Sequence, residues 1–157
     1  MPGKDAPQGG RHRRAVAPDR SIAIQDTADP ADESALRAAL LEFNFRATGF
    51  RDGRSLSCFL RDESGRLIAG IDGFTWGGYA KVETLWVDES LRGQGLGRRL
   101  LQAAIEEAAA RGCATMVVDT HTFQAPEFYP RFGFQAVGRF DGTPVGHGQV
   151  FFQKRLR

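Results

Sequence analysis

A glycine-rich segment between two apolar patterns limits what this chain can fold into more than any other part of it. The segment covers residues 92–100 with the sequence RGQGLGRRL, and a short apolar run at residues 85–87 precedes it. An amphipathic helix pattern begins inside the segment and continues to about Arg111. This order predicts a strand, a tight loop and then a helix N-terminus. The unpaired N–H groups and positive dipole end of such a terminus suit a phosphate or pyrophosphate.

The glycine spacing distinguishes between the known kinds of phosphate-binding loop. A dinucleotide-binding loop needs a third glycine where this chain has Arg98, and a P-loop needs a Gly-Lys-Ser/Thr ending that the sequence lacks. The pattern that is present, Arg-x-x-Gly-x-Gly, is formed by Arg92, Gly95 and Gly97. Glycines at these places let the backbone close on an anion, because a Cβ would hold the anion away.

A second motif, FYPRFGF, follows at residues 128–134. In this order and spacing the two motifs resemble the GNAT family of N-acetyltransferases, over roughly residues 21–156. The resemblance implies that acetyl-CoA is the cofactor and co-substrate, and that the glycine-rich segment holds its pyrophosphate. The residues implied for this contact are Arg92, Gly93, Gln94, Gly95, Leu96, Gly97 and Arg98.

The resemblance also implies how the rest of the cofactor is held and how it reacts. The pantetheine arm would hydrogen-bond the main chain of Leu85, Trp86 and Val87, and a backbone N–H there would polarise the thioester carbonyl. Tyr129 would be the general acid for the departing thiolate. Thr122 stands where the family often has an asparagine that contacts the pantetheine arm, and a hydroxyl can substitute for that amide.

The acceptor amine needs a base, because a lysine-like amine with a pKa of about 10.4 is almost fully protonated at neutral pH. Glu83 is the candidate, since it lies two residues before Leu85 on the expected strand and should share a face with it. Asp119 and Asp72 are weaker alternatives, and a plain exposed strand carboxylate is the other interpretation of Glu83. The sequence has no Gly-x-Ser-x-Gly elbow, which favours direct attack by the amine over an acyl-enzyme.

The acceptor itself stays open, as a small-molecule or peptide amine. Several aromatic residues suit either the core or an acceptor pocket, and three acids suit a cationic amine: Phe59, Trp76, Tyr79, Trp86 and Phe123, with Glu42, Asp72 and Asp141. The alternative function is a non-catalytic CoA- or acyl-CoA-binding sensor or interaction domain. Such a domain would keep the glycine-rich loop but would have no need of Tyr129 beside the sulfur.

Composition sets the remaining limits. The chain has 157 residues, 41% of them hydrophobic and 25% charged, which predicts a single domain, at residues 21–157. Residues 1–20 are rich in proline, glycine and arginine and have few apolar side chains, which predicts a disordered basic tail. A net charge of +2 gives no reason to expect a nucleic-acid partner, and no apolar run is long enough to span a membrane. Two distant cysteines and three scattered histidines indicate no metal site, and unpaired reduced thiols are typical of a cytoplasmic protein. The sequence leaves the oligomeric state open, with a homodimer as one alternative.

The hydrophobic periodicities predict alternating strands and helices, an α/β fold, in an order that resembles the GNAT acetyltransferase fold. The resemblance implies a mixed central sheet of about seven strands with helices on both faces. The family resemblance implies that the sheet is splayed in its middle. A helix is expected from Pro30 to just before Gly49, a second up to Arg111 and a short third one at 126–131. Strands are expected at 21–25, 55–61, 66–75, 79–87, 114–120, 134–139 and 149–155.

Overall fold

The computed structural model describes residues 22–157. The contacts divide the chain into two units, and the boundary along the sequence lies between Ala39 and Leu40. Residues 22–25 form no strand, so the strand expected at 21–25 is wrong for these residues. Their apolar alternation is real, but a strand needs a hydrogen-bonded neighbour, and none of the seven strands pairs with them. The tail expected at 1–20 lies outside the described residues.

Helix α1 (Pro30–Thr48) begins and ends where local sequence signals predict. Asp29 caps its start, because the N–H of Ala31 donates to Asp29 Oδ1 at 2.8 Å. Pro30 is its first residue, and Gly49 follows its end with a positive φ of 76°. Residues 49–53 carry no helix, in agreement with the little room that the sequence leaves there.

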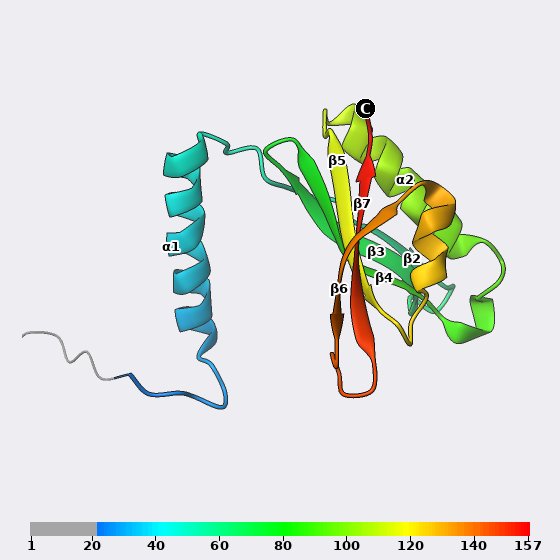
Figure 1. Cartoon of the computed structure of the whole chain (residues 1–157), viewed down its shortest axis with the longest axis horizontal. Coiled ribbons are helices and arrows are strands. Elements are labelled where there is room, and N and C mark those ends of the chain that lie inside the picture. The colour runs from blue at the N-terminus through cyan, green and yellow to red at the C-terminus, as the bar shows by residue number, and fades with distance from the viewer. Residues whose placement is uncertain (1–21) are drawn as a thin grey trace, which may run out of the picture. The chain divides into compact units, whose positions relative to one another are not determined.

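The second unit is built on a mixed sheet with the strand order β1-β3-β4-β5-β7-β6, in which β2 also pairs with β3 (Figure 1). Among the described strands, β4 and β5 form the only parallel pair. The expected strand at 55–61 is divided into two. The strands are β1 (Arg54–Ser55), β2 (Cys58–Arg61), β3 (Leu67–Trp76), β4 (Tyr79–Val87), β5 (Thr115–His121), β6 (Gln135–Asp141) and β7 (Gly148–Arg155).

The sheet and two helical segments share one hydrophobic core. Helix α2 (Leu96–Ala110) packs against β3 and β4, and the 3-10 helix η2 (Pro126–Phe132) contributes the buried ring of Tyr129 to the same cluster (Figure 1). A further 3-10 turn, η1 (Glu89–Leu91), precedes α2. The helix periodicity predicts an apolar stripe of Leu96, Leu100, Ala104 and Ala108. Leu100, Ala104 and Ala108 are buried together with Leu101, whereas Leu96 is half-buried.

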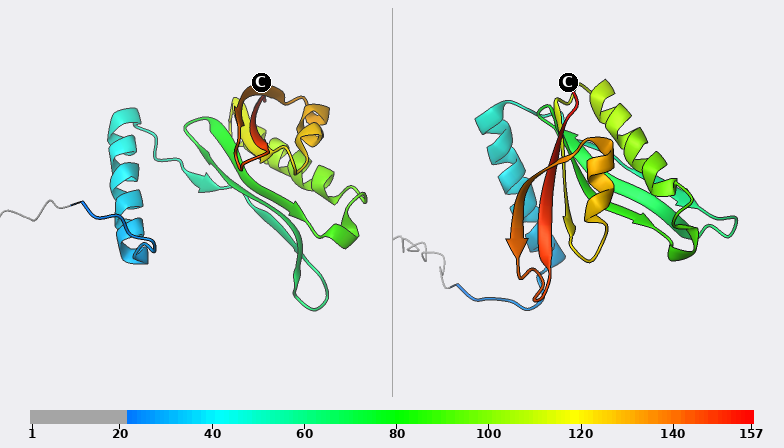
Figure 2. Two further views of the ribbon diagram at one scale, coloured as in Figure 1. Left: turned by 60° about the horizontal axis from the view of Figure 1, so that its bottom comes forward. Right: turned by 45° about the vertical axis from the view of Figure 1, so that its right-hand side comes forward.

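Strands β4 and β5 pair over only part of their length. Residues 79–82 pair with residues 115–118, and beyond this point the two strands diverge (Figure 2). β4 nevertheless stays paired with β3 as far as Val87, and β5 stays paired with β7 as far as His121. The facing edges of residues 83–87 and 119–121 therefore carry backbone groups without a strand partner. Unpaired backbone groups inside a sheet need another partner, so this opening is where a ligand can bind.

A β-bulge stands where the two strands begin to diverge. Asp72 is paired with Thr84 but Gly73 with Val82, which makes Glu83 an extra residue in β4. Position 73 is restricted to glycine, because a Cβ there would collide with the carbonyl oxygen of the strand opposite.

The bulge also shifts the alternation of side chains along β4. Val82 before it and Leu85 after it both contribute to the core. Glu83 is exposed, and its Oε1 lies 3.7 Å from Lys81 Nζ. The expectation that Glu83 shares a face with Leu85 is therefore wrong, because it assumes a period of two that the extra residue interrupts.

The close approach at Gly73 predicts a specific loss of stability. Gly73→Ala should lower the free energy of unfolding by about 1–3 kcal/mol, because the new methyl group has to displace backbone. Gly138→Ala is the matched control, since a Cβ at this strand position meets no atom within 4 Å. Urea denaturation of both variants measures the difference. Equal stability of the two would show that the bulge does not require glycine.

Candidate functional site

The loop between β4 and α2 is held by its own hydrogen bonds. Asp88 Oδ1 accepts from the N–H of Ser90 at 3.0 Å and from its hydroxyl at 2.6 Å, which starts the η1 turn. Arg92 Nε donates to the carbonyl of Val87 at 3.3 Å. Gly95 then turns the chain into α2 with a positive φ of 80°, a conformation that favours glycine.

The N-terminus of α2 offers unpaired N–H groups at the end of this loop. The N–H of Arg99 makes the first bond of the helix, to the carbonyl of Gly95 at 3.0 Å. The N–H groups of Leu96, Gly97 and Arg98 precede that bond, and Gly95 has no side chain to cap them. Arg98 is exposed beside them. Three free amides, a helix dipole and a guanidinium together suit a pyrophosphate.

The free edge of β4 supplies a second set of backbone donors. The N–H of Asp88 donates to the carbonyl of Ile68 in β3, at 2.9 Å. Because N–H directions alternate along a strand, the N–H groups of Leu85 and Val87 point to the opposite edge, where β5 has diverged. The side chains of Leu85 and Val87 pack against the core, whereas that of Trp86 is exposed. Of the three predicted pantetheine contacts, two thus have a suitable main-chain donor.

Tyr129 has a buried ring and a hydroxyl that reaches accessible space. The ring contacts those of Phe128, Phe134 and Phe152, with centroids 5.3, 5.8 and 5.7 Å away. Every fully buried side-chain N or O atom of residues 22–157 has a hydrogen-bond partner. Tyr129 Oη makes no hydrogen bond in this range, and it is therefore not fully buried. Burial, helped by the charge of Asp119, raises the pKa of Tyr129 to about 12. The phenol therefore keeps its proton at neutral pH.

The free edge of β5 is partly covered by Gln124, which the sequence analysis missed. Gln124 Oε1 accepts from the N–H of His121 at 2.9 Å and from the hydroxyl of Thr120 at 2.8 Å. Thr122 instead faces β7, where its hydroxyl oxygen accepts from the N–H of Gly148 at 3.0 Å. The Thr122 hydroxyl still has a proton to donate, so its predicted cofactor contact stays a prediction. No sequence motif marks Gln124, because its role arises only where β5 has lost its neighbour.

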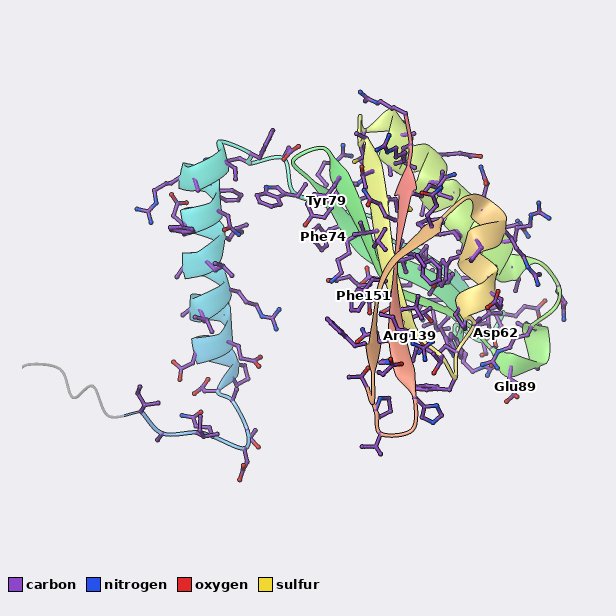
Figure 3. The ribbon with its side chains drawn as sticks, viewed as in Figure 1. Asp62, Phe74, Tyr79, Glu89, Arg139 and Phe151 are labelled. Carbon is purple, nitrogen blue, oxygen red and sulfur yellow. The ribbon has the colours of Figure 1, made fainter. Side chains whose placement is uncertain are left out.

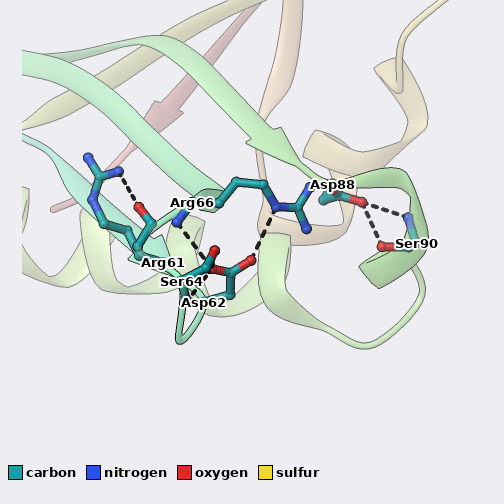
Figure 4. Close-up of polar contacts among 7 residues, drawn as sticks. Arg61, Asp62, Ser64, Arg66, Asp88 and Ser90 are labelled. Carbon is teal, nitrogen blue, oxygen red and sulfur yellow. Dashed lines mark hydrogen bonds and ion pairs between the residues drawn. The ribbon is translucent and has the colours of Figure 1, made fainter.

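Arg66 connects the β2–β3 turn to the start of the glycine-rich loop (Figure 4). Its guanidinium lies 3.1 Å from an Asp62 carboxylate oxygen and 3.0 Å from one of Asp88. Hydrogen bonds from the Ser64 side chain and from Arg66 lower the pKa of Asp62 to about 2, and the Ser90 hydroxyl lowers the pKa of Asp88. Both carboxylates therefore stay charged well into acidic pH, and Arg66 holds the loop in place.

The described part of the chain has neither a metal-binding cluster nor a membrane-spanning helix. Residues 22–157 contain no group of three or more histidine, cysteine, aspartate or glutamate side chains that could hold a metal ion. In the same range no helix has the length and the apolar character that crossing a membrane requires.

Comparison with known proteins identifies the family. A family model described as the acetyltransferase (GNAT) family matches residues 21–134. The chain belongs to the GNAT acetyltransferase family. An acetyltransferase of Agrobacterium fabrum is 33% identical over 136 residues, which cover 87% of this chain and 99% of the relative. Blasticidin-S acetyltransferase of Streptomyces morookaense is 39% identical over 97 residues, 60% of this chain and 70% of that enzyme.

A solved structure agrees with this assignment. The crystal structure of an Agrobacterium tumefaciens protein assigned as an acetyltransferase superposes with a TM-score of 0.80 at 33% identity, over 86% of this chain and 98% of that one. The family resemblance and the fold class predicted from the sequence are thereby confirmed, as is the enzyme class.

Because Arg66 connects the β2–β3 turn to the glycine-rich loop, its replacement should affect cofactor binding more than the stability of the fold. Arg66→Ala should weaken CoA binding several-fold because the loop loses its support, and should change the free energy of unfolding by less than about 1 kcal/mol because the ion pairs are exposed. Calorimetry with CoA and urea denaturation measure the two effects.

The control for Arg66 is Arg139→Ala, which removes an exposed ion pair with Asp141 (2.7 Å) on β6, a strand that β5 and β7 separate from β4. This variant should bind CoA like the wild type. Equal CoA affinity of both variants would show that Arg66 does not position the loop. The effect of Arg66→Ala should persist at pH 5, because the folded pKa of Asp62 lies far below that pH.

Proposed function

We propose that this GNAT enzyme transfers an acetyl group from acetyl-CoA to a primary amine by direct attack within a ternary complex. The observation that carries the proposal is the opening between β4 and β5, which leaves the N–H groups of Leu85 and Val87 without a strand partner. The amides at the start of α2 lie at the end of the loop that follows β4. One continuous segment thus offers donors for an acyl group and for a pyrophosphate.

The residues present suit acetyl-CoA. The N–H groups of Leu96, Gly97 and Arg98 would hold the pyrophosphate, with charge from the exposed guanidiniums of Arg92 and Arg98. When bound, acetyl-CoA supplies the activated acetyl group.

Backbone donors at the free edge of β4 would serve the chemistry. The N–H of Leu85 or Val87 would donate to the acyl oxygen, where negative charge develops as the amine attacks. These donors belong to a paired strand, so they need no rearrangement when the charge appears.

Two side chains would move the protons. Glu83 would take the proton of the ammonium group, directly or through water, so that the neutral nitrogen forms the new C–N bond. The C–S bond breaks, and Tyr129 Oη would give its proton to the departing thiolate. The nitrogen loses its second proton to solvent, from which Tyr129 regains one. The exposure of Glu83 at the bulge supports its role, since the carboxylate can meet an acceptor that arrives from solution.

We propose a small molecule as the acceptor. Two relatives of this chain are named for such acceptors, blasticidin S and glucosamine 6-phosphate. A peptide amine remains the contrasting outcome, and a panel of small amines and lysine peptides assayed by thiol release separates the two.

Tyr129→Phe should lower kcat roughly tenfold or more and leave the CoA dissociation constant within about twofold of the wild type, because only the proton donor is lost. The control is Tyr79→Phe, the other of the two tyrosines of the chain. Tyr79 packs edge-on against Phe74, with centroids 5.9 Å apart, next to the turn of the β3–β4 hairpin (Figure 3). Equal turnover of Tyr129→Phe and wild type would exclude Tyr129 as the acid. CoA binding without any acetyl transfer by the wild type would favour the sensor function.

Glu83→Gln should lower kcat/KM at pH 7, with a deficit that shrinks as the pH approaches 10. At high pH more of the amine is already neutral, so less depends on a base. The pH profile of thiol release measures this, with Glu63→Gln in the β2–β3 turn as a control carboxylate. A deficit that is constant with pH would assign Glu83 a structural role instead.

A further inference from the structure

A small hollow on β2, β3 and β4 lies beside the bulge and has two aromatic walls. Phe59 is paired with Gly70, and Gly70 with Trp86, so the three residues form one row across the strands. Gly70 leaves the floor of the hollow without a side chain, and the Phe59 ring leans over it, since a Cβ there would lie 2.9 Å from Phe59 Cδ1. Phe59 is 54% exposed and Trp86 is 42% exposed. These two side chains border a hollow of about 60 Å³.

A carboxylate lies at one end of this hollow. Asp72 and Thr84 form the next row on the same face of the sheet, and both line the hollow. Ser57 Oγ donates to Asp72 Oδ1 at 2.5 Å, and Ser57 is bonded in turn to Ser55 at 2.7 Å. Among the ion pairs of residues 22–157 none includes Asp72. The serines therefore orient the carboxylate without neutralising its charge.

This combination favours one class of ligand group. A cation gains from the carboxylate and from the electron-rich faces of Phe59 and Trp86. An anion would be repelled by Asp72, and a neutral apolar group would contact the rings but gain no charge interaction with the carboxylate. The volume suits a head group rather than a whole acceptor. We propose that the hollow binds a second cationic group of the acceptor, so that the enzyme acetylates small amines that carry a further ammonium or guanidinium group.

The position of the hollow connects it to the reaction, and the inference in this respect rests on the proposed function. Thr84 directly follows Glu83, the proposed base. Trp86 stands between Leu85 and Val87, whose N–H groups face the opening between β4 and β5. A cation held between the two rings would thus lie against the strand that carries the acetyl-transfer groups, and the other amine of the same molecule would be the nucleophile.

The other aromatic and acidic residues that the sequence suggested for acceptor binding do not line this hollow. Trp76 and Tyr79 pack edge-on, with centroids 6.1 Å apart, at the far end of the hairpin. Phe123 stacks on His121 with centroids 5.1 Å apart. The remaining acids already have cationic partners, Glu42 with Arg51 at 3.3 Å and Asp141 with Arg139 at 2.7 Å. Asp72 alone among these acids combines an open charge with aromatic neighbours.

The experiment compares amines that differ in the second charge. Cadaverine and agmatine carry a second cation, whereas n-hexylamine has nearly the same length and a methyl group in its place. The wild type should acetylate the two dications with a kcat/KM at least about tenfold above that for n-hexylamine. Asp72→Asn should raise the KM for the dications about tenfold and leave kcat, the KM for n-hexylamine and the CoA dissociation constant unchanged. Glu63→Gln is the control and should match the wild type throughout.

Each outcome decides one of the two proposals. A wild type that binds acetyl-CoA but acetylates none of these amines or lysine peptides contradicts the proposed function and this inference with it. A wild type that acetylates the amines, with Asp72→Asn affecting all of them equally or none, refutes the hollow as a cation site and leaves the proposed function standing. Trp86→Leu is a second variant, which tests the inference independently if Asp72→Asn does not fold. It keeps the carboxylate and its serine partners and should raise the KM for agmatine several-fold, and an unchanged KM would also refute the inference.

Discussion

The separation of β4 from β5 is the constraint on which the rest of the structure depends. Parallel pairing holds the two strands together as far as Val82 and Val118, and each strand is then kept in place only by its outer neighbour. The extra residue at Glu83 marks the point of divergence, and the absence of a side chain at Gly73 makes that extra residue possible. An interior pair of strands with unpaired edges is costly, and binding a ligand compensates for this cost. The family assignment agrees with acetyl-CoA as that ligand.

The remaining features surround this opening and give it different chemistry along its length. On the side of α2 lie the helix amides and the loop that Arg66 holds through Asp88. On the side of β5, Gln124 satisfies one exposed N–H. The buried ring of Tyr129 keeps its phenol protonated, while Glu83 stays exposed and charged groups can reach it from solution.

Some of this arrangement could be predicted because it depends on neighbours in the chain. Helix α1 starts at Asp29–Pro30, and η2 ends at Gly133 with a positive φ, because capping and turn preferences act within a few residues. The strand expected at 21–25 fails for the opposite reason, since its alternation is local but its partner is not. Glu83 shows the same limit: the face that it occupies could not be predicted from the alternation alone, because a bulge depends on the opposite strand.

The sequence by itself determined the family, the order of most strands and helices, and the glycine-rich loop, because each of these follows from short-range spacing and backbone preference. Only the tertiary structure decided which edges of β4 and β5 stay unpaired, that Arg66 meets Asp88, that Gln124 replaces a strand partner, and that Phe59, Asp72 and Trp86 border one hollow. These contacts join residues from different strands and turns, and their geometry depends on strand register and twist, which no local pattern in the chain encodes.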